Sequence, residues 1–218
     1  MQYKIRRLAA FAISLLPSTG LRTAFYKRFF GYRIGAGTIL GFGVQIVVDR
    51  FETGVNCVVG RGTTFVGPFS VEIGENTFIG RNNRFSCGAA AADPAHSGMA
   101  YARRLVIGSD ALVHEDHLFD VYGSILIGAR SWIAGSGSQF WTHGASVMDR
   151  DIIIGCACYV GSAVRFAPGS SISDNTIVGM GAVVANRFDA TGIVIGGVPA
   201  RFIKHRTQED NFHFERDW

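Results

Sequence analysis

The chain has 218 residues, of which 28 are Gly and 48% are hydrophobic, and its formal net charge is +4. The hydrophobic fraction allows a sizeable core and excludes a disordered chain, and Gly does not recur at every third position as in collagen. Average usage would give roughly 15 glycines, so almost half of them need a structural reason. Four cysteines without a Cys-x-x-Cys motif form no disulfide framework, so we expect a cytoplasmic protein with reduced thiols.

Residues 1–33 form a basic N-terminal arm. They carry seven Lys or Arg and no acid, and the first carboxylate is Asp49. The rest of the chain has 21 − 7 = 14 basic residues against 17 acidic ones, so nothing in the body indicates nucleic-acid binding. Two interpretations of the arm stay open together: amphipathic helices that cap the domain, or helices that lie on an anionic membrane at its inner face.

A six-residue repeat follows the arm. An aliphatic or aromatic residue returns at every sixth position and is usually followed by Gly, as in IGENTF from Ile73, IGSDAL from Ile107 and IGCACY from Ile154. This period fits neither an amphipathic helix nor plain strand alternation. It predicts short strands and tight turns stacked as a parallel β-helix over residues 34–204. We expect the Gly after each aliphatic residue to supply turn conformations that a side chain would forbid.

The repeat resembles the hexapeptide-repeat acyltransferase family, whose fold is a left-handed parallel β-helix. The resemblance implies an all-β triangular prism with about eighteen residues per coil, and a homotrimer with active sites between neighbouring subunits. The expected architecture is this prism, preceded by one or two N-terminal amphipathic helices and followed by a short helical tail at 205–218. Two excursions, at 88–104 and 144–151, interrupt the repeat. Insertions of this kind leave a solenoid as loops on one side, where we expect a cleft.

The segment from Gln139 to Gly155 resembles the sugar acetyltransferases of the family, in which a Thr-His pair closes a coil before an external loop. The resemblance assigns the general base to His143. An imidazole can take the proton of an acceptor hydroxyl that attacks a thioester. The alternative is a corner histidine that only hydrogen-bonds a loop.

Three neighbours of this segment are candidates for binding the acceptor or orienting the base: His117, Asp120 and Trp141. His117 stands where the repeat places a small residue. It would bind the acceptor, orient His143 across a subunit boundary, or be a buried polar residue at a trimer interface.

The segment from Ile195 to Arg206 resembles the closing motif of the family, which implies acetyl-CoA as the acyl donor. By this resemblance, small residues offer backbone groups to the pantetheine arm and two bases meet the nucleotide phosphates. The residues in these roles are Gly161, Ser162, Gly179, Ala182, Arg201 and Lys204. The alternative for the two bases is a solvated basic helix.

The resemblance therefore implies an O-acetyltransferase that acts on a sugar hydroxyl in surface-polysaccharide biosynthesis, with a lipid-linked or nucleotide-linked acceptor. One competing class is a zinc enzyme of carbonic-anhydrase type with His114, His117 and His143 as ligands. The 26-residue spacing from His117 to His143 predicts different faces of the prism, so we expect no metal. The other competing class is a non-catalytic β-helix scaffold.

Overall fold

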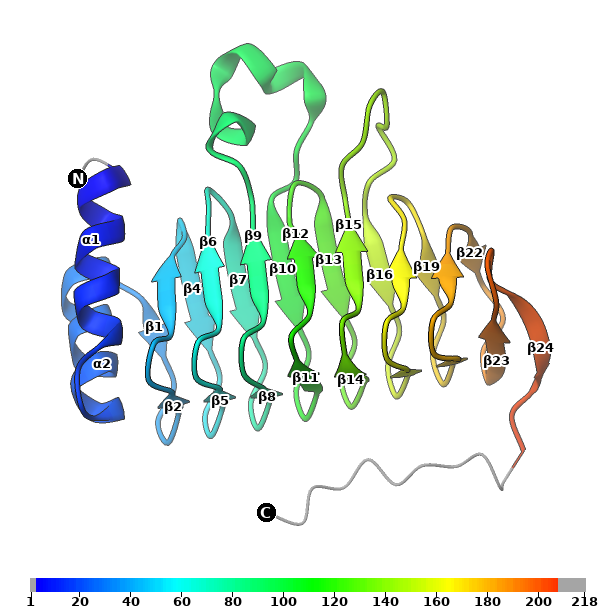
Figure 1. Ribbon diagram of the computed structural model, residues 1–218, viewed down its shortest axis with the longest axis horizontal. Helices are drawn as coiled ribbons and strands as arrows, with labels where there is room; N and C mark the ends of the chain where they lie inside the picture. Colours follow the sequence, from blue (N-terminus) through cyan, green and yellow to red (C-terminus); the bar gives the residue numbers. More distant parts are fainter. Residues whose placement is uncertain (1–2, 208–218) are drawn as a thin grey trace.

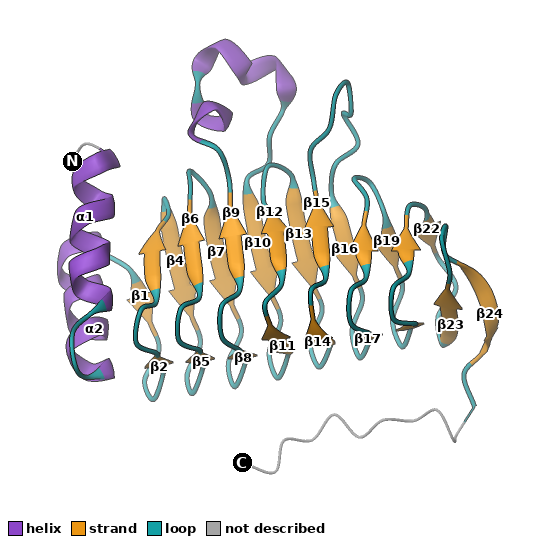
Figure 2. Cartoon of the chain, viewed as in Figure 1, coloured by secondary structure: helices purple, strands orange, loops and turns teal. Residues whose placement is uncertain are grey.

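The computed structural model describes residues 3–207 and shows a parallel β-helix closed at its N-terminal end by helices (Figure 1). The helices are α1 (Tyr3–Ser14), α2 (Thr19–Phe25) and the π-helical turn η1 (Tyr26–Phe30). Two 3₁₀ helices, η2 (Ala89–Ala92) and η3 (Pro94–Met99), lie in a loop that leaves the prism, as Figure 2 shows. The predicted parallel β-helix is confirmed.

Three sheets form the sides of the prism, and each coil contributes one strand to each of them in turn. Sheet A contains β1 (Arg33–Ile34), β4 (Arg50–Thr53), β7 (Ser70–Ile73), β10 (Arg104–Ile107), β13 (Ser124–Ile127), β16 (Ile152–Ile154), β19 (Ser171–Ile172) and β22 (Arg187–Phe188). Sheet B contains β2 (Ile39–Leu40), β5 (Val58–Val59), β8 (Phe78–Ile79), β11 (Leu112–Glu115), β14 (Trp132–Ser136), β17 (Tyr159–Val160), β20 (Ile177–Val178), β23 (Ile193–Gly196) and β24 (Arg201–His205). Sheet C contains β3 (Gln45–Val47), β6 (Thr64–Val66), β9 (Arg84–Ser86), β12 (Leu118–Asp120), β15 (Gln139–Trp141), β18 (Arg165–Phe166) and β21 (Val183–Val184).

The repeated residue of each hexapeptide points into the prism and stacks on its equivalent in the next coil. In sheet A these are mainly isoleucines, such as Ile107, Ile127 and Ile154, which are paired in register and buried. In sheet C they are phenylalanines whose ring centroids lie 4.4 to 5.1 Å apart from coil to coil. This phenylalanine stack consists of Phe65, Phe85, Phe119, Phe140 and Phe166. The stack stabilises the inner face of sheet C, because aromatic stacking adds to the burial of large apolar area.

The glycine after the aliphatic residue has a different reason from the expected one. At Gly74 and Gly155 the backbone φ is not positive, but an added Cβ would lie 2.3 Å from the Ser109 backbone nitrogen or 2.5 Å from the Asp174 backbone nitrogen. Close approach of successive coils therefore selects glycine there. The left-handed conformation falls two residues later, at positions such as Asn76 with φ of 55°, where asparagine tolerates it.

Coil length also differs from the expected eighteen residues along much of the prism. Near the C-terminal end the register is 18, since Tyr159 pairs with Ile177 (177 − 159 = 18). Closer to the middle Leu118 pairs with Gln139 (139 − 118 = 21). The longer coils move residues around the prism relative to a strict eighteen-residue count.

The N-terminal end of the β-helix is closed by the helices. At the N-terminal end the buried Tyr26 hydroxyl donates to the Val44 carbonyl at 2.9 Å and accepts from the Ile46 N–H at 3.1 Å. The Thr19 hydroxyl accepts from the Leu40 N–H at 2.8 Å. These helical residues satisfy backbone groups that an open first coil would expose, which is the role of a solenoid cap.

At the C-terminal end sheet B gains a last, exposed strand, where a solvated basic helix was the alternative expected from the sequence. Residues Arg201–His205 form β24, which pairs antiparallel with β23. The helical conformation expected from residue 205 onward is thus wrong for His205, because its backbone extends the edge of sheet B. Residues 208–218 of the expected tail lie outside the described part of the chain.

Candidate active site

Three successive connections from sheet C to sheet A lie at one corner of the prism, which we call the C–A corner. The connection from β9 to β10 spans residues 87–103, the one from β12 to β13 spans 121–123, and the one from β15 to β16 spans 142–151. The two long connections contain the excursions expected from the sequence, and Figure 1 shows that both project from the same edge. The short connection lies between them and leaves a gap in which side chains of three coils meet.

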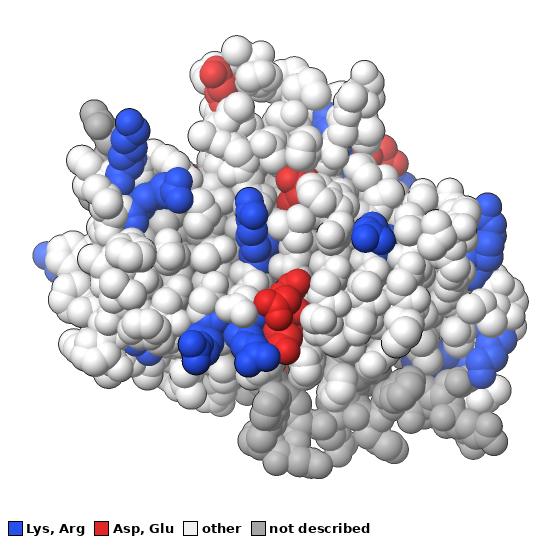
Figure 3. All heavy atoms as spheres, viewed as in Figure 1, with Lys and Arg blue, Asp and Glu red and all other residues white. Residues whose placement is uncertain are grey.

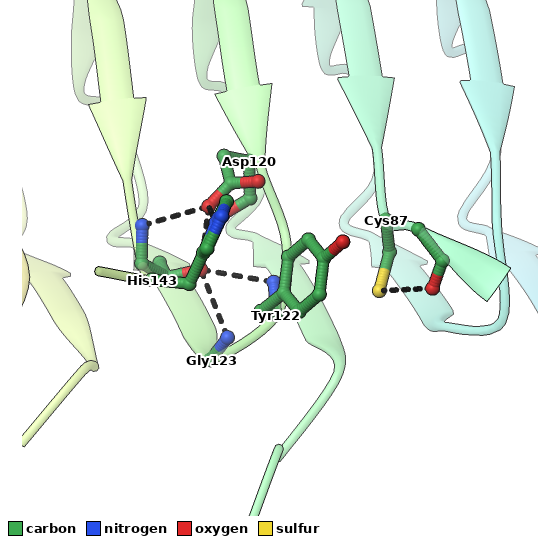
Figure 4. A network of polar contacts seen from close by, with 7 residues as sticks. Cys87, Asp120, Tyr122, Gly123 and His143 are labelled. Carbon is green, nitrogen blue, oxygen red and sulfur yellow. Dashed lines mark hydrogen bonds and ion pairs between the residues drawn. The ribbon is translucent and has the colours of Figure 1, made fainter. Parts of the chain in front are cut away.

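His143 and Asp120 form the centre of this gap (Figure 4). Asp120 ends β12, His143 follows β15, and the His143 Nδ1 lies 2.7 Å from the Asp120 Oδ2. The Asp120 side chain is 8% exposed, whereas that of His143 is 43% exposed. An ionised carboxylate only accepts hydrogen bonds, so this contact places a proton on Nδ1 and leaves the lone pair of a neutral ring on Nε2.

Thr142 hydrogen-bonds the short connection, residues 121–123, to the following coil. Its Oγ1 accepts hydrogen bonds from the Tyr122 N–H at 2.9 Å and the Gly123 N–H at 2.8 Å and donates to the Asp120 carbonyl. The Thr142 N–H donates to the Asp120 Oδ2 at 3.2 Å. The carboxylate that contacts His143 is therefore held by the backbone, and its position does not depend on His143 alone.

Tyr122 is a site residue that the sequence patterns did not single out. Its ring lies over His143, with 4.3 Å between ring centroids, and contacts Tyr101 of the first excursion edge-on at 5.1 Å. Burial raises the pKa of the Tyr122 phenol, so the ring is a neutral wall for the imidazole. The sequence signal is its register, because Tyr122 precedes the Thr142–His143 pair by one coil of about twenty residues.

Two further residues complete the walls of the gap. The Arg150 guanidinium, in the second excursion, lies 4.8 Å from the centroid of the Tyr101 ring in the first, so the two excursions contact each other. Cys87 follows β9 and is buried, and burial raises the pKa of its thiol to about 12. A thiol in that state is protonated near neutral pH and is not a nucleophile.

A groove of about 730 Å³ runs from His143 across the outer face of sheet C. We call it the sheet C groove. His143, Asp120, Tyr122 and Trp141 line it at one end, and Arg84 and Arg7 line it toward helix α1. Figure 3 shows this face, with basic atoms over α1 and over the strands of sheet C. The volume suits a ligand of small-molecule size.

His117 is not brought to His143. It precedes β12 at the opposite end of sheet C, at the corner between sheets B and C (the B–C corner), and is 1% exposed. Its Nδ1 accepts a hydrogen bond from the Ser138 N–H at 3.0 Å. A side chain this buried does not reach an acceptor in the groove, and in this chain Asp120, not His117, contacts the candidate base. The expected separation holds for a different reason: the two histidines lie at opposite ends of one sheet, not on different sheets.

The three histidines considered as zinc ligands do not converge within the chain. His114 is exposed on β11 of sheet B, while His117 and His143 lie at different corners. Among residues 3–207, no group of three or more His, Cys, Asp or Glu side chains has the geometry of a metal site.

The residues expected to hold coenzyme A lie apart from the groove. Gly161 and Ser162 follow β17, Gly179 and Ala182 follow β20, both at the B–C corner, and Arg201 and Lys204 lie on β24. The N–H groups of Gly161, Gly179 and Ala182 already donate to the carbonyls of Val178, Ile195 and Gly179. What these three residues offer a ligand is therefore small size, and not free backbone donors.

No family model matches the chain. Among curated proteins, it is 33% identical over 122 residues to a colanic acid biosynthesis acetyltransferase, WcaF of Escherichia coli K12, which covers 51% of the chain and 64% of the relative. It is 23% identical over 149 residues to the galactoside O-acetyltransferase of Escherichia coli K12, covering 67% of the chain and 69% of the relative. The chain thus spans just under two thirds of the length of the first relative.

Solved structures resemble the fold at low sequence identity. A UDP-N-acetylglucosamine acyltransferase superimposes with a TM-score of 0.51 and 15% identity, over 80% of this chain and 70% of that one. LpxA from Acinetobacter baumannii superimposes with a TM-score of 0.52 and 18% identity, over 79% of this chain and 62% of that one. These likenesses show the fold alone, and confirm a left-handed parallel β-helix.

Proposed function

We propose that the chain is an acetyl-CoA-dependent O-acetyltransferase of the hexapeptide-repeat acyltransferase family, which its similarity to two acetyltransferases supports. Its acceptor is a sugar hydroxyl, and its pathway is surface-polysaccharide biosynthesis. The similarity to relatives named for colanic acid and galactoside acetylation supports both statements. The observation that carries the proposal is His143, whose ring is held by Asp120 at 2.7 Å and stands open to the sheet C groove.

The geometry supports direct transfer with His143 as general base. The acceptor hydroxyl gives its proton to Nε2 while its oxygen attacks the thioester carbonyl of acetyl-CoA. The tetrahedral intermediate then collapses, the C–S bond breaks, and the thiolate takes the proton back from Nε2. Asp120 holds Nδ1–H throughout and stabilises the imidazolium that forms between the two steps. Cys87, a protonated thiol, takes no covalent part.

The two halves of the proposed site lie at different corners of one chain. His143 is at the C–A corner, and Gly161 and Ser162 are at the B–C corner on the far side of sheet C. A donor held along the B–C corner of one subunit would meet His143 of another. We therefore include a homotrimer with shared clefts in the proposal.

The N-terminal helices supply a surface for a membrane. On α1 the exposed side chains of Ile5, Leu8 and Phe11 form one apolar stripe, which the exposed Leu15 continues just beyond the helix, and Lys4 and Arg7 lie close to it. Such a stripe beside basic residues is typical of a helix lying on an anionic bilayer. In the described part of the chain, no helix is long and apolar enough to cross a membrane. We place the enzyme in the cytoplasm, at the inner face of the membrane.

The test is acetyl transfer from acetyl-CoA to a panel of sugars, sugar phosphates and nucleotide sugars, read by the mass of the product. We expect His143→Ala to lower kcat/KM by about 100-fold or more, the usual contribution of a general base. Asp120→Asn should lower it less, because the base remains but loses its ionised partner. His114→Ala, which removes an exposed histidine from sheet B, is the matched control. Full activity of His143→Ala would remove this residue as base, and a wild-type chain that acetylates nothing in the panel would contradict the function.

A further inference from the structure

The sheet C groove is longer than the reaction at His143 needs, and its far end is basic. We propose that Arg84 and Arg7 bind a phosphate or diphosphate group of the acceptor, so that the enzyme acetylates a phosphate-bearing sugar and not a free one. The inference rests on the proposed function for the identity of the acceptor. The anion site itself rests only on the groove.

Arg84 points outward from β9 and is exposed. In register it lies beside Leu118, which in turn pairs with Gln139 of the strand that leads to His143. Within residues 3–207, the ion pairs of the structure leave Arg84 without a carboxylate partner. Its register partners on the two neighbouring strands, Thr64 of β6 and Leu118 of β12, are uncharged. An exposed guanidinium without an acid nearby is available to an anionic ligand.

Arg7 brings a second guanidinium to the same cavity from a distant part of the sequence. Helix α1 packs along β3, the first strand of sheet C, and Arg7 projects from it into the groove lining. Its contact is with the Tyr3 ring, at 6.0 Å from guanidinium carbon to centroid. Guanidinium groups bind phosphate oxygens in pairs of parallel hydrogen bonds, which suits them better than lysine for this role.

The charge balance of the groove favours an anion at this end and not at the other. Asp120 is the single carboxylate among the described lining residues, and it is held by His143 and the Thr142 N–H. The Asp120 carboxylate therefore repels an anion at the end near His143, whereas no carboxylate among the described lining residues lies at the end near Arg84. A ligand with a neutral ring at His143 and a phosphate at Arg84 matches both ends.

The separation of the two ends fits one such ligand. Arg84 lies two strands from Gln139 across the sheet, and His143 lies four residues beyond Gln139 along the chain. With strand spacings of about 4.8 Å and a rise of about 3.3 Å per residue, the two α carbons are at most roughly 16 Å apart, since the strand ends at Trp141. The long arginine side chain shortens this gap to the span of a sugar residue joined to a phosphate.

A direct binding experiment tests the site without knowledge of the sugar. Inorganic pyrophosphate is titrated into the full chain by calorimetry in the presence of saturating coenzyme A, which occupies the donor's own phosphate site. We expect Arg84→Gln and Arg7→Gln each to weaken binding by about tenfold or more, because each variant loses a charge-assisted hydrogen bond to the phosphate. Arg50→Gln removes the same charge from sheet A and should leave binding unchanged. Equal binding by Arg84→Gln and Arg50→Gln, or no binding by the wild type, would overturn the inference.

A kinetic arm separates this inference from the proposed function. With acceptors from the panel above, Arg84→Gln should raise KM for the sugar 1-phosphate by about tenfold or more, and should affect the much weaker transfer to the neutral sugar far less. If acetyl transfer occurs but Arg84→Gln changes KM equally for both acceptors, the phosphate site is contradicted and the proposed function is not. Pyrophosphate binding that depends on Arg84 in a chain that acetylates nothing contradicts the function alone.

The same titration distinguishes the two sources of a phosphate-bearing sugar. UDP in solution represents a nucleotide-linked acceptor, and farnesyl diphosphate in phosphatidylcholine vesicles represents a lipid-linked one. Stronger competition with pyrophosphate by farnesyl diphosphate supports a lipid-linked acceptor, and stronger competition by UDP supports a nucleotide-linked one. Failure of both to compete contradicts a diphosphate acceptor.

Discussion

Two histidines of adjoining coils show how position decides the chemistry of one residue type. His143 stands exposed beside a carboxylate, whereas His117 is buried and accepts a backbone hydrogen bond from Ser138. Burial is the largest cause that lowers the pKa of His117 to about 4, and the charge of His114 adds to it, against Ile133, Asp116 and Glu115. The buried ring is neutral in the folded chain near pH 7, and its hydrogen bond with Ser138 links its coil to the next one.

His117 makes the stability of the fold depend on pH in a defined window. Its pKa is about 4 in the folded chain, against an ordinary value of 6.5, so between these values the unfolded chain binds more protons than the folded one. The stabilisation from the neutral ring is complete above about pH 6.5 and is lost progressively toward pH 4, by at most about 3 kcal/mol.

We expect His117→Asn, whose amide oxygen can still accept the Ser138 N–H, to be less stable at pH 7 but to lose less stability at pH 4.5 than the wild type. Urea unfolding midpoints at the two pH values check this. The wild-type and variant chains share every other titrating group, so equal losses in the two would count against the assignment.

At the scale of elements, the stiffness of the site comes from the phenylalanine stack behind it. Phe119 is fully buried between Phe85 and Phe140, at 4.4 Å from each by ring centroid. Its neighbours in the chain, Leu118 and Asp120, face the groove. The alternation of a strand thus puts the ring that orders the core directly behind the carboxylate that holds His143.

Phe119→Ala should destabilise the chain by about 3–5 kcal/mol, because it leaves a cavity within a continuous stack. Phe42→Ala, at a side chain that is 54% exposed on an outer turn, should change stability by only about 0.5 kcal/mol. Chemical unfolding at a fixed protein concentration measures both. Similar losses in the two variants would contradict a specific role of the stack.

At the scale of the whole molecule, the N-terminal helices combine a cap for the prism with an exposed apolar surface. One face closes the first coil through Tyr26 and Thr19, and the other carries the exposed apolar stripe of α1. Arg7 links the helices to the candidate active site, because it lies on α1 and its side chain lines the sheet C groove. A membrane under α1 would therefore lie beside the basic end of the acceptor site.

The double substitution Leu8→Ser with Phe11→Ser should abolish co-sedimentation with phosphatidylglycerol vesicles, because these side chains are 71% and 51% exposed and supply the apolar contact. Binding by the wild-type chain should weaken with added salt, since its bases contribute. Met180→Ser, at a side chain that is 79% exposed near the other end of the prism, is the matched control. Undiminished binding by the double variant would show that the stripe does not contact lipid.

The six-residue recurrence was sufficient to predict the β-helix and the rows of side chains that point into the prism. Each coil repeats the same local conformation, so each recurring aliphatic side chain is directed to the interior. Resemblance at Thr142 and His143 was likewise sufficient to find the candidate base. Both are properties of short stretches of chain. Neither depends on how many residues a given coil contains.

Everything that depends on counting across coils was decided by the packed structure. Coils without an excursion range from 16 residues (187 − 171) to 21 (139 − 118), and this variation has no signature in a six-residue pattern. The pairing of His143 with Asp120, the stacking of Tyr122 and the separation from His117 therefore follow from strand register. The glycines after the aliphatic residues are set by the distance between coils, and Arg7 reaches the groove because α1 packs on β3. A local repeat specifies directions within one coil, whereas contacts between coils are specified by how the coils stack.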